Sequence, residues 1–258
     1  MDIKVRNVVI IGGATGIGYA TAQAFLDAGV NSVYVSSRSE SKMRHAAQNL
    51  RCYNNQKVLF GELDIADCKS HIEFLEKITS EIGTIPDGLV ISSGIHRDSG
   101  GWRGFNTTEE DWDTVMNINL KGTFFLMRNF TNYLCSKSVK GKICIVSSQA
   151  AHRDLLGAYP ISKNAISGVI HAYGKHLVEK GIILNGIEPG LVDTPMMSYF
   201  HEYTNGIREG KIWGDNSIHR IIRPEEIAKL ILFLMSEGSE IMAGTVLLAN
   251  GGCKSITI

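Results

Sequence analysis

A phenol and an ammonium stand four residues apart in Tyr159-Pro-Ile-Ser-Lys163. On a helix, residues i and i+4 lie on one face, so this spacing places the lysine charge beside the tyrosine ring. A neighbouring cation favours phenolate over phenol and lowers a pKa that starts near ~10, which suits a tyrosine to proton transfer at neutral pH. The same spacing also occurs on ordinary solvated helix faces, so the rest of the chain decides between the two interpretations.

Two serines end the apolar run that precedes this motif. The run begins at Lys142 and is typical of a buried strand, which ends at Ser147 and Ser148. A serine hydroxyl at that strand end could hold a substrate oxygen against the Tyr159 phenol. Adjacent strand residues point to opposite faces, so only one of the two serines can serve.

A glycine-rich turn follows the first β-branched run. Val8–Ile11 leads into Gly12-Gly-Ala-Thr-Gly16-Ile-Gly18, and a helical pattern over 19–26 comes next. Strand, glycine turn and helix in this order form the first half of a dinucleotide-binding unit, in which the helix N-terminus meets the pyrophosphate. The alternative is a tight strand-to-helix connection without a ligand.

The second expected strand, 32–37, ends in Ser37 and Arg38 about 20 residues after the glycine turn, where dinucleotide-binding folds read the ribose. An acidic residue there would favour NAD, whereas an arginine accommodates the 2′-phosphate of NADP. The alternative is a solvated arginine paired with Glu40. We favour the phosphate interpretation.

Strands and helices alternate along the whole chain. Expected strands are 8–11, 32–37, 57–60, 89–94, 142–147, 182–187 and 244–249, and expected helices cover about 19–26, 67–81, 109–135 and 159–179, with one more beginning at Pro224. Nearly continuous apolar strands indicate a parallel sheet covered on both faces. We therefore predict one domain over residues 1–258, an α/β Rossmann-type doubly wound parallel sheet of about seven strands with helices on both faces.

Composition narrows the function classes. Lysine plus arginine and aspartate plus glutamate number 26 each in 258 residues, so no net field favours nucleic acid or an anionic membrane. The five scattered cysteines form no CxxC pair, and no histidine or carboxylate cluster has metal-ligand spacing. We expect free thiols, no metal, no membrane span and a cytoplasmic location.

With these residues in view, the chain resembles the classical short-chain dehydrogenases/reductases nearly from end to end. The resemblance implies a catalytic tetrad of Asn119, Ser148, Tyr159 and Lys163. It also implies a nicotinamide cofactor held by Gly12, Thr15, Gly16, Ile17, Gly18, Ser37, Arg38, Asp64, Ile65, Ser93, Gly94, Tyr159, Lys163, Pro189, Gly190, Val192 and Thr194. A homo-oligomer, tetramer or dimer, is a further implication of the resemblance alone.

The chain departs from the family pattern in places. The Asn-Asn-Ala-Gly segment after the fourth strand is Ile91-Ser-Ser-Gly94 here, so the side-chain hydrogen bonds usual there must be replaced. Family spacing counted back from Tyr159 lands on Val146, which cannot hydrogen-bond. The second serine of the family's pair is the catalytic one, which favours Ser148, with Ser147 as the alternative.

These observations predict an NADP(H)-dependent oxidoreductase that interconverts a carbonyl and a secondary alcohol of a small molecule. Ser148 would polarise the substrate oxygen, Tyr159 would transfer the proton, Lys163 would lower the tyrosine pKa and bind the nicotinamide ribose, and Asn119 would hold a relay water. Alternatives are an NAD-dependent alcohol or dihydrodiol dehydrogenase and a non-catalytic NADP(H)-sensing regulator. Residues 194–223 form a long connection, for which we expect a substrate lid.

Overall fold

The structure is a computed structural model, and it describes residues 2–53, 55–97, 106–152, 156–200 and 217–253. No helix within these ranges has the length and apolar character needed to cross a membrane.

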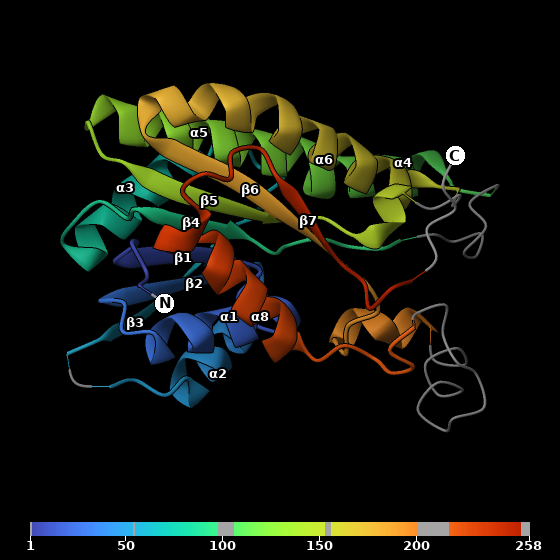
Figure 1. The fold of residues 1–258 in the computed structure, drawn as a ribbon, viewed down its shortest axis with the longest axis horizontal. Coiled ribbons are helices and arrows are strands. Elements are labelled where there is room, and N and C mark those ends of the chain that lie inside the picture. The colour runs from blue at the N-terminus through green and yellow to red at the C-terminus, as the bar shows by residue number, and fades with distance from the viewer. Residues whose placement is uncertain (1, 54, 98–105, 153–155, 201–216, 254–258) are drawn as a thin grey trace.

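One parallel sheet of seven strands organises the molecule, in the order β3-β2-β1-β4-β5-β6-β7 (Figure 1). The strands are β1 Asn7–Ile11, β2 Ser32–Ser37, β3 Lys57–Glu62, β4 Gly88–Ile91, β5 Gly141–Val146, β6 Ile182–Pro189 and β7 Val246–Ala249. The strand order reverses between β1 and β4, and ligands of such sheets bind at the carboxyl ends of the strands beside this switch point. The predicted fold class is confirmed.

Helices cover both faces of the sheet. The helices are α1 Gly16–Asp27, α2 Glu40–Asn49, α3 His71–Ile82, α4 Glu109–Val115, α5 Thr123–Ser136, α6 Ala158–Leu177 and α8 Pro224–Leu234. Short segments are η1 Met116–Gly122 (a π-helix) and the 3-10 turns η2 Gln149–His152, η3 Val178–Lys180, η4 Pro195–Phe200 and η5 Glu237–Ser239. Figure 1 shows α3, α5 and α6 on one face and α1, α2 and α8 on the other.

The alternation of side chains along β1 divides the core into two layers. Val9 and Ile11 pack in the cluster beneath α3, α5 and α6, whereas Val8 and Ile10 pack in the cluster beneath α1 and α8. All four side chains are buried. A strand buried on both faces needs apolar residues at every position, which explains the continuous runs in the sequence.

Several element predictions need correction. Helix α2 was not predicted, because its sequence is mostly polar and only Met43 and Ala46 are buried. Helix α3 begins at His71 rather than Asp67, after a turn in which Ser70 N donates to Asp67 O. The helix predicted over 109–135 contains the π-helical segment η1 between α4 and α5.

The apolar side chains of α6 do not all lie in the core. Ile166, Ile170 and Leu177 are buried against the sheet, but Tyr173 is 38% exposed. Its ring packs edge-on against Phe124 of α5 at a centroid distance of 5.4 Å. Tyr173 therefore lies at the outer seam between α5 and α6 rather than in the core.

Candidate active site

The glycine turn forms a cradle at the carboxyl end of β1. Gly12 and Gly16 have φ values of 78° and 54°, which side chains rarely adopt. A Cβ on Gly12 would lie 2.6 Å from Ser93 N, and one on Gly18 would lie 2.2 Å from Gly12 O. The turn thus packs backbone against backbone and leaves the N-terminus of α1 open toward the cavity, as a pyrophosphate site requires.

Two cations stand at the outer end of this cavity. Arg38 follows β2 and is exposed, and Lys42 lies in the first turn of α2; both line the cavity. Within the described part of the chain no carboxylate pairs with Arg38, and Glu40 pairs instead with Arg44, Nη2 to Oε1 2.7 Å. The alternative of a pairing between Arg38 and Glu40 is therefore not found.

The segment after β4 is fixed by an asparagine on the π-helix. Asn119 is 1% exposed; its Oδ1 accepts from Ile95 N at 2.9 Å and its Nδ2 donates to Ile95 O at 2.9 Å. The same Nδ2 donates to Ser162 Oγ on α6 at 3.2 Å. Asn119 therefore joins the β4 loop to the helix that carries Tyr159 and Lys163.

The two serines at the end of β5 have different surroundings. Ser147 is 4% exposed; its hydroxyl donates to Lys163 O at 3.0 Å and lies 2.8 Å from Ser167 Oγ. The Ser148 hydroxyl instead lies near the Tyr159 phenol, whose pKa it lowers, and accepts from Ala150 N at 3.1 Å. This arrangement matches the expected alternation, with Ser148 next to the phenol.

The pKa of the Tyr159 phenol differs from the predicted one. Burial raises the pKa of the Tyr159 phenol, and the neighbouring Ser148 hydroxyl lowers it by a smaller amount. Lys163 does not produce the predicted lowering, because its Nζ lies 5.8 Å from the ring centroid and donates to Val146 O at 2.9 Å. Burial lowers the pKa of Lys163 itself to about 8.

The end of β6 closes the other side of the site. Gly190 N donates to Ala249 O at 3.0 Å, and a Cβ on Gly190 would lie 2.9 Å from Asn250 Cα. Thr194 lies close to Gly16, where a Cβ would be 3.0 Å from its methyl carbon. The β6 end therefore faces the glycine turn across the cavity.

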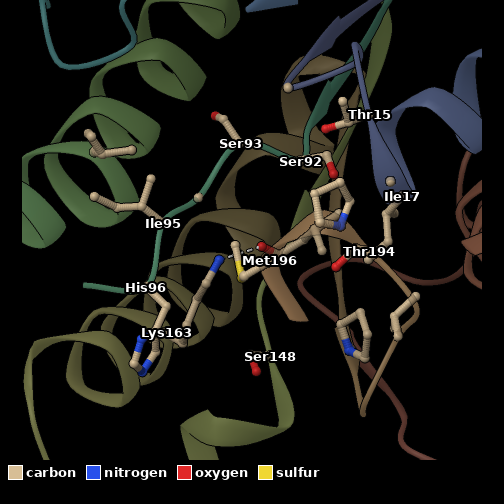
Figure 2. A pocket seen from close by; sticks show the side chains of 18 of the residues that line it. Thr15, Ile17, Ser92, Ser93, Ile95, His96, Ser148, Lys163, Thr194 and Met196 are labelled. Carbon is tan, nitrogen blue, oxygen red and sulfur yellow. Dashed lines mark hydrogen bonds between the residues drawn. The ribbon is translucent and has the colours of Figure 1, made fainter. Parts of the chain in front are cut away.

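These elements enclose one cavity of about 700 Å³ (Figure 2). Figure 2 shows Lys163, His96 and Ser148 on one side and Thr15, Ile17 and Thr194 on the other. The predicted residues that line it are Gly12, Thr15, Gly16, Ile17, Ser37, Arg38, Ile65, Ser93, Gly94, Ser148, Tyr159, Lys163, Pro189, Gly190, Val192 and Thr194.

Three predicted residues do not line the cavity. Gly18 is buried in α1 against the glycine turn, and Asn119 lies behind the β4 loop. Asp64 is exposed, and its Oδ1 accepts from Ala66 N at 3.0 Å, while its neighbours Leu63 and Ile65 line the cavity. Ser93 lines it, but its buried Oγ has no hydrogen-bond partner, so this serine does not replace the hydrogen bonds expected of the family's asparagine.

Among the polar cavity residues that sequence reasoning missed are Lys42 and His96. Lys42 lies four residues after Arg38, in the first turn of α2. Because α2 was not predicted, its position near Arg38 in space was not recognised. His96 packs its ring against Tyr159 at a centroid distance of 5.1 Å and an angle of 54°. Its place just after Gly94 in the β4 loop was the available signal.

Sequence comparison finds relatives over nearly the whole chain. The profile of a family described as enoyl-(acyl carrier protein) reductase matches residues 12–254. The 3-oxoacyl-(acyl-carrier-protein) reductase FabG of Thermotoga maritima is 31% identical and covers 98% of this chain and 99% of its own. The L-rhamnose 1-dehydrogenase (NADP(+)) of Thermoplasma acidophilum is 26% identical, with 98% and 97% covered.

Solved structures share the fold. A short-chain type dehydrogenase/reductase from Mycobacterium marinum superposes with a TM-score of 0.86 at 24% identity, covering 98% of this chain and 97% of its own. Actinorhodin polyketide ketoreductase, crystallised with NADPH, has a TM-score of 0.85 at 24% identity, covering 96% and 97%. At this identity the likeness concerns the fold alone.

Proposed function

This chain belongs to the classical short-chain dehydrogenases/reductases, a family of oxidoreductases, and from that membership we propose that it interconverts a carbonyl and a secondary alcohol with NADP(H). One observation carries the proposal. Ser148 and Tyr159 lie together at one end of the cavity with Lys163 beside them, and two cations line the other end. A cavity with a proton donor at one end and cations at the other fits a phosphorylated nicotinamide cofactor together with a carbonyl substrate.

The chain's own residues fit the cofactor. The glycine cradle and the N-terminus of α1 suit the pyrophosphate, and Arg38 with Lys42 suits the 2′-phosphate. Thr15, Ile17, Ile65, Gly94, Pro189, Val192 and Thr194 line the path between them. Two similar proteins add support for NADP(H). The dehydrogenase of Thermoplasma acidophilum is named for NADP(+), and the ketoreductase was crystallised with NADPH.

When bound, the cofactor supplies or accepts the hydride. In reduction the Ser148 hydroxyl holds and polarises the carbonyl oxygen, and Tyr159 donates its phenolic proton to that oxygen. A tyrosine phenol is protonated at neutral pH, so Tyr159 has a proton to donate in reduction. In oxidation the same groups act in reverse, with Tyr159 accepting the alcohol proton.

Lys163 and Asn119 complete the proposed machinery. The Lys163 ammonium lies over the tyrosine ring and would bind the nicotinamide ribose. Its positive charge would therefore act mainly by holding the cofactor. Asn119 holds the β4 loop against α6, which keeps the cavity wall in place. We also propose that Asn119 holds a water molecule in a proton relay with Lys163.

The substrate end of the cavity is mostly apolar. Beyond His96 and Gln149, its described walls are Ile95, Ala150, Leu156, Pro160, Met196 and Met197. Such walls favour a carbonyl flanked by an apolar or aromatic group over a small polar sugar. The lid expected over 194–223 falls largely on residues 201–216, outside the described residues, so this part of the proposal stands on the sequence.

We also propose a homo-oligomer, a tetramer or a dimer, that acts in the cytoplasm. Helices α4 and α6 carry exposed apolar side chains at Trp112, Ile161 and Tyr173, which a second copy could cover. All five cysteines lie within the described residues and are free thiols, as in a reducing compartment. Light scattering on a sizing column tests the assembly, and a monomer at micromolar concentration would exclude it.

A substrate screen tests the proposed function. Purified protein is mixed with NADPH or NADH and a panel of ketones, aldehydes and quinones, and the loss of absorbance of the reduced cofactor is followed. We expect turnover of at least one carbonyl, faster with NADPH. Binding of NADPH without turnover of any carbonyl would favour a sensing regulator, and faster turnover with NADH would favour an NAD enzyme.

A further inference from the structure

A buried carboxylate lies behind the candidate active site and takes no part in the proposed chemistry. Glu188, near the end of β6, is 1% exposed. Its Oε1 accepts from Ser167 Oγ at 2.7 Å, and its Oε2 lies 2.7 Å from His152 Nε2. Burying a carboxylate is costly unless hydrogen bonds compensate, so these contacts must contribute something beyond the filling of space.

The contacts continue from Ser167 to the catalytic helix and strand. Ser167 Oγ lies 2.8 Å from Ser147 Oγ, and the Ser147 hydroxyl donates to Lys163 O at 3.0 Å. Polar contacts therefore run from His152 through Glu188, Ser167 and Ser147 to the main chain of Lys163. Each hydroxyl has one proton, so Ser167 donates to Glu188 while Ser147 donates in turn to Ser167 Oγ or to Lys163 O. We call these five residues the Glu188 network.

Each end of the network borders a residue of the site. Ser147 precedes Ser148, the network reaches the carbonyl of Lys163 itself, and Glu188 precedes Pro189. Ser147 and Glu188 both meet α6, so the network fixes the ends of β5 and β6 to this helix beside the cavity, which Ser147 also lines. It joins the ends of β5 and β6, η2 and α6.

We propose that Glu188 is a positioning residue, which sets the distances between Ser148, Lys163 and the Pro189–Gly190 segment through the Glu188 network. The inference rests on the proposed function. Acid–base chemistry depends on such distances, since misplacing a reacting group by about 1 Å can cost about 100-fold in rate. Hydrogen bonding, rather than the negative charge, performs this role.

Three variants separate these possibilities. Glu188→Ala removes both contacts, whereas Glu188→Gln keeps an acceptor for Ser167 and an amide that can meet His152. Ser167→Ala removes the hydroxyl between Glu188 and Ser147 and leaves the Glu188 side chain in place. This variant replaces Glu188→Ala if the latter does not fold. Asp87→Asn is the control, because Asp87 is another carboxylate that accepts hydrogen bonds, from the backbone N–H groups of Arg6 and Asn7, but at the amino ends of the central strands β1 and β4.

Hydrogen–deuterium exchange measures positioning without any need for turnover. In Glu188→Ala and Ser167→Ala we expect faster exchange in peptides covering 145–150 and 159–167 than in wild type. Asp87→Asn should leave these peptides unchanged and affect those around β1 and β4. Unchanged exchange at 145–150 and 159–167 in both network variants would overturn the inference, whether or not the carbonyl screen succeeds.

Steady-state rates on the best carbonyl of the screen give the second measurement. Glu188→Ala should lower kcat at least about tenfold with KM for NADPH within about twofold, and Glu188→Gln should recover kcat to within about threefold of wild type. Asp87→Asn should keep kcat near wild type. A Glu188→Gln rate as low as that of Glu188→Ala would contradict hydrogen-bond positioning, and absence of wild-type turnover would instead count against the proposed function.

Discussion

Lys163 Nζ donates to the main-chain carbonyl of Val146 at 2.9 Å. This bond ties the start of α6 to the last residue of β5, two positions before Ser148. The ammonium group is buried there, and this burial lowers the pKa of Lys163 to about 8. The charge that the proposed chemistry needs is therefore present at neutral pH and lost just above it.

A pH profile of the reduction tests this charge. The ratio kcat/KM for NADPH reports groups of the free enzyme, so it should be level at neutral pH and fall as pH rises through about 8. The fall follows because the Lys163 ammonium, whose pKa is lowered, loses its proton there. Initial rates from pH 6 to pH 10 at saturating carbonyl measure it.

The matched control is Lys163→Arg, whose guanidinium keeps its charge at every pH used. This variant should be slower but should lose the decline near pH 8. A wild-type profile that stays level through pH 9.5, or an identical decline in the arginine variant, would show that another group controls the rate.

The two cations at the outer end of the cavity should set cofactor preference. A charge-assisted contact contributes roughly 1.5–3 kcal/mol, so Arg38→Ala should weaken NADPH binding tenfold or more and leave NADH nearly unchanged. Lys42→Ala should act in the same direction with a smaller loss. Fluorescence titration of both cofactors measures this, and equal losses for NADPH and NADH would remove Arg38 from the role.

The two serines should respond differently to substitution. Ser148→Ala removes the hydroxyl beside the Tyr159 phenol and should lower kcat by at least about 100-fold. Ser147→Ala removes the contacts to Lys163 O and Ser167 and breaks the Glu188 network, so it should lower kcat about tenfold, as Glu188→Ala does and clearly less than Ser148→Ala. Rate measurements with matched circular dichroism spectra compare them, and the opposite ranking would reverse the assignment.

Limited proteolysis tests the lid expected over residues 194–223. Cleavage of the apo protein should concentrate in this segment and slow when NADPH is added, because a lid closes over bound cofactor. Mass spectrometry of the fragments locates the cuts. Equal cleavage rates with and without NADPH would leave the segment as a fixed wall.

Much of the fold was predictable because β1, β2 and β5 are buried on both faces, and continuous apolar runs record this directly. That the two serines have different surroundings was also predictable from the alternation of strand side chains, whereas the preference for Ser148 came from the family resemblance and stays a prediction. Helix α2 was missed because its sequence has no apolar stripe, and only Met43 and Ala46 are buried. Lys42, which lies in this helix, was missed with it.

Other features needed three dimensions. Burial outweighs every nearby group at Tyr159, and the degree of burial of one phenol is not written in local spacing. Glu188 meets Ser167 and His152 across 21 and 36 residues of chain, so nothing near it in the sequence announces the network.

The central claim is that Tyr159 transfers the proton, and the Tyr159→Phe variant tests it most directly. The variant keeps the ring that packs against His96 and removes only the phenolic oxygen and its proton. We predict that NADPH binding, measured by fluorescence, stays within about twofold of wild type while kcat for the best carbonyl falls at least about 100-fold, as for lost general acid catalysis. Turnover within about threefold of wild type, with the same pH profile, would contradict the account.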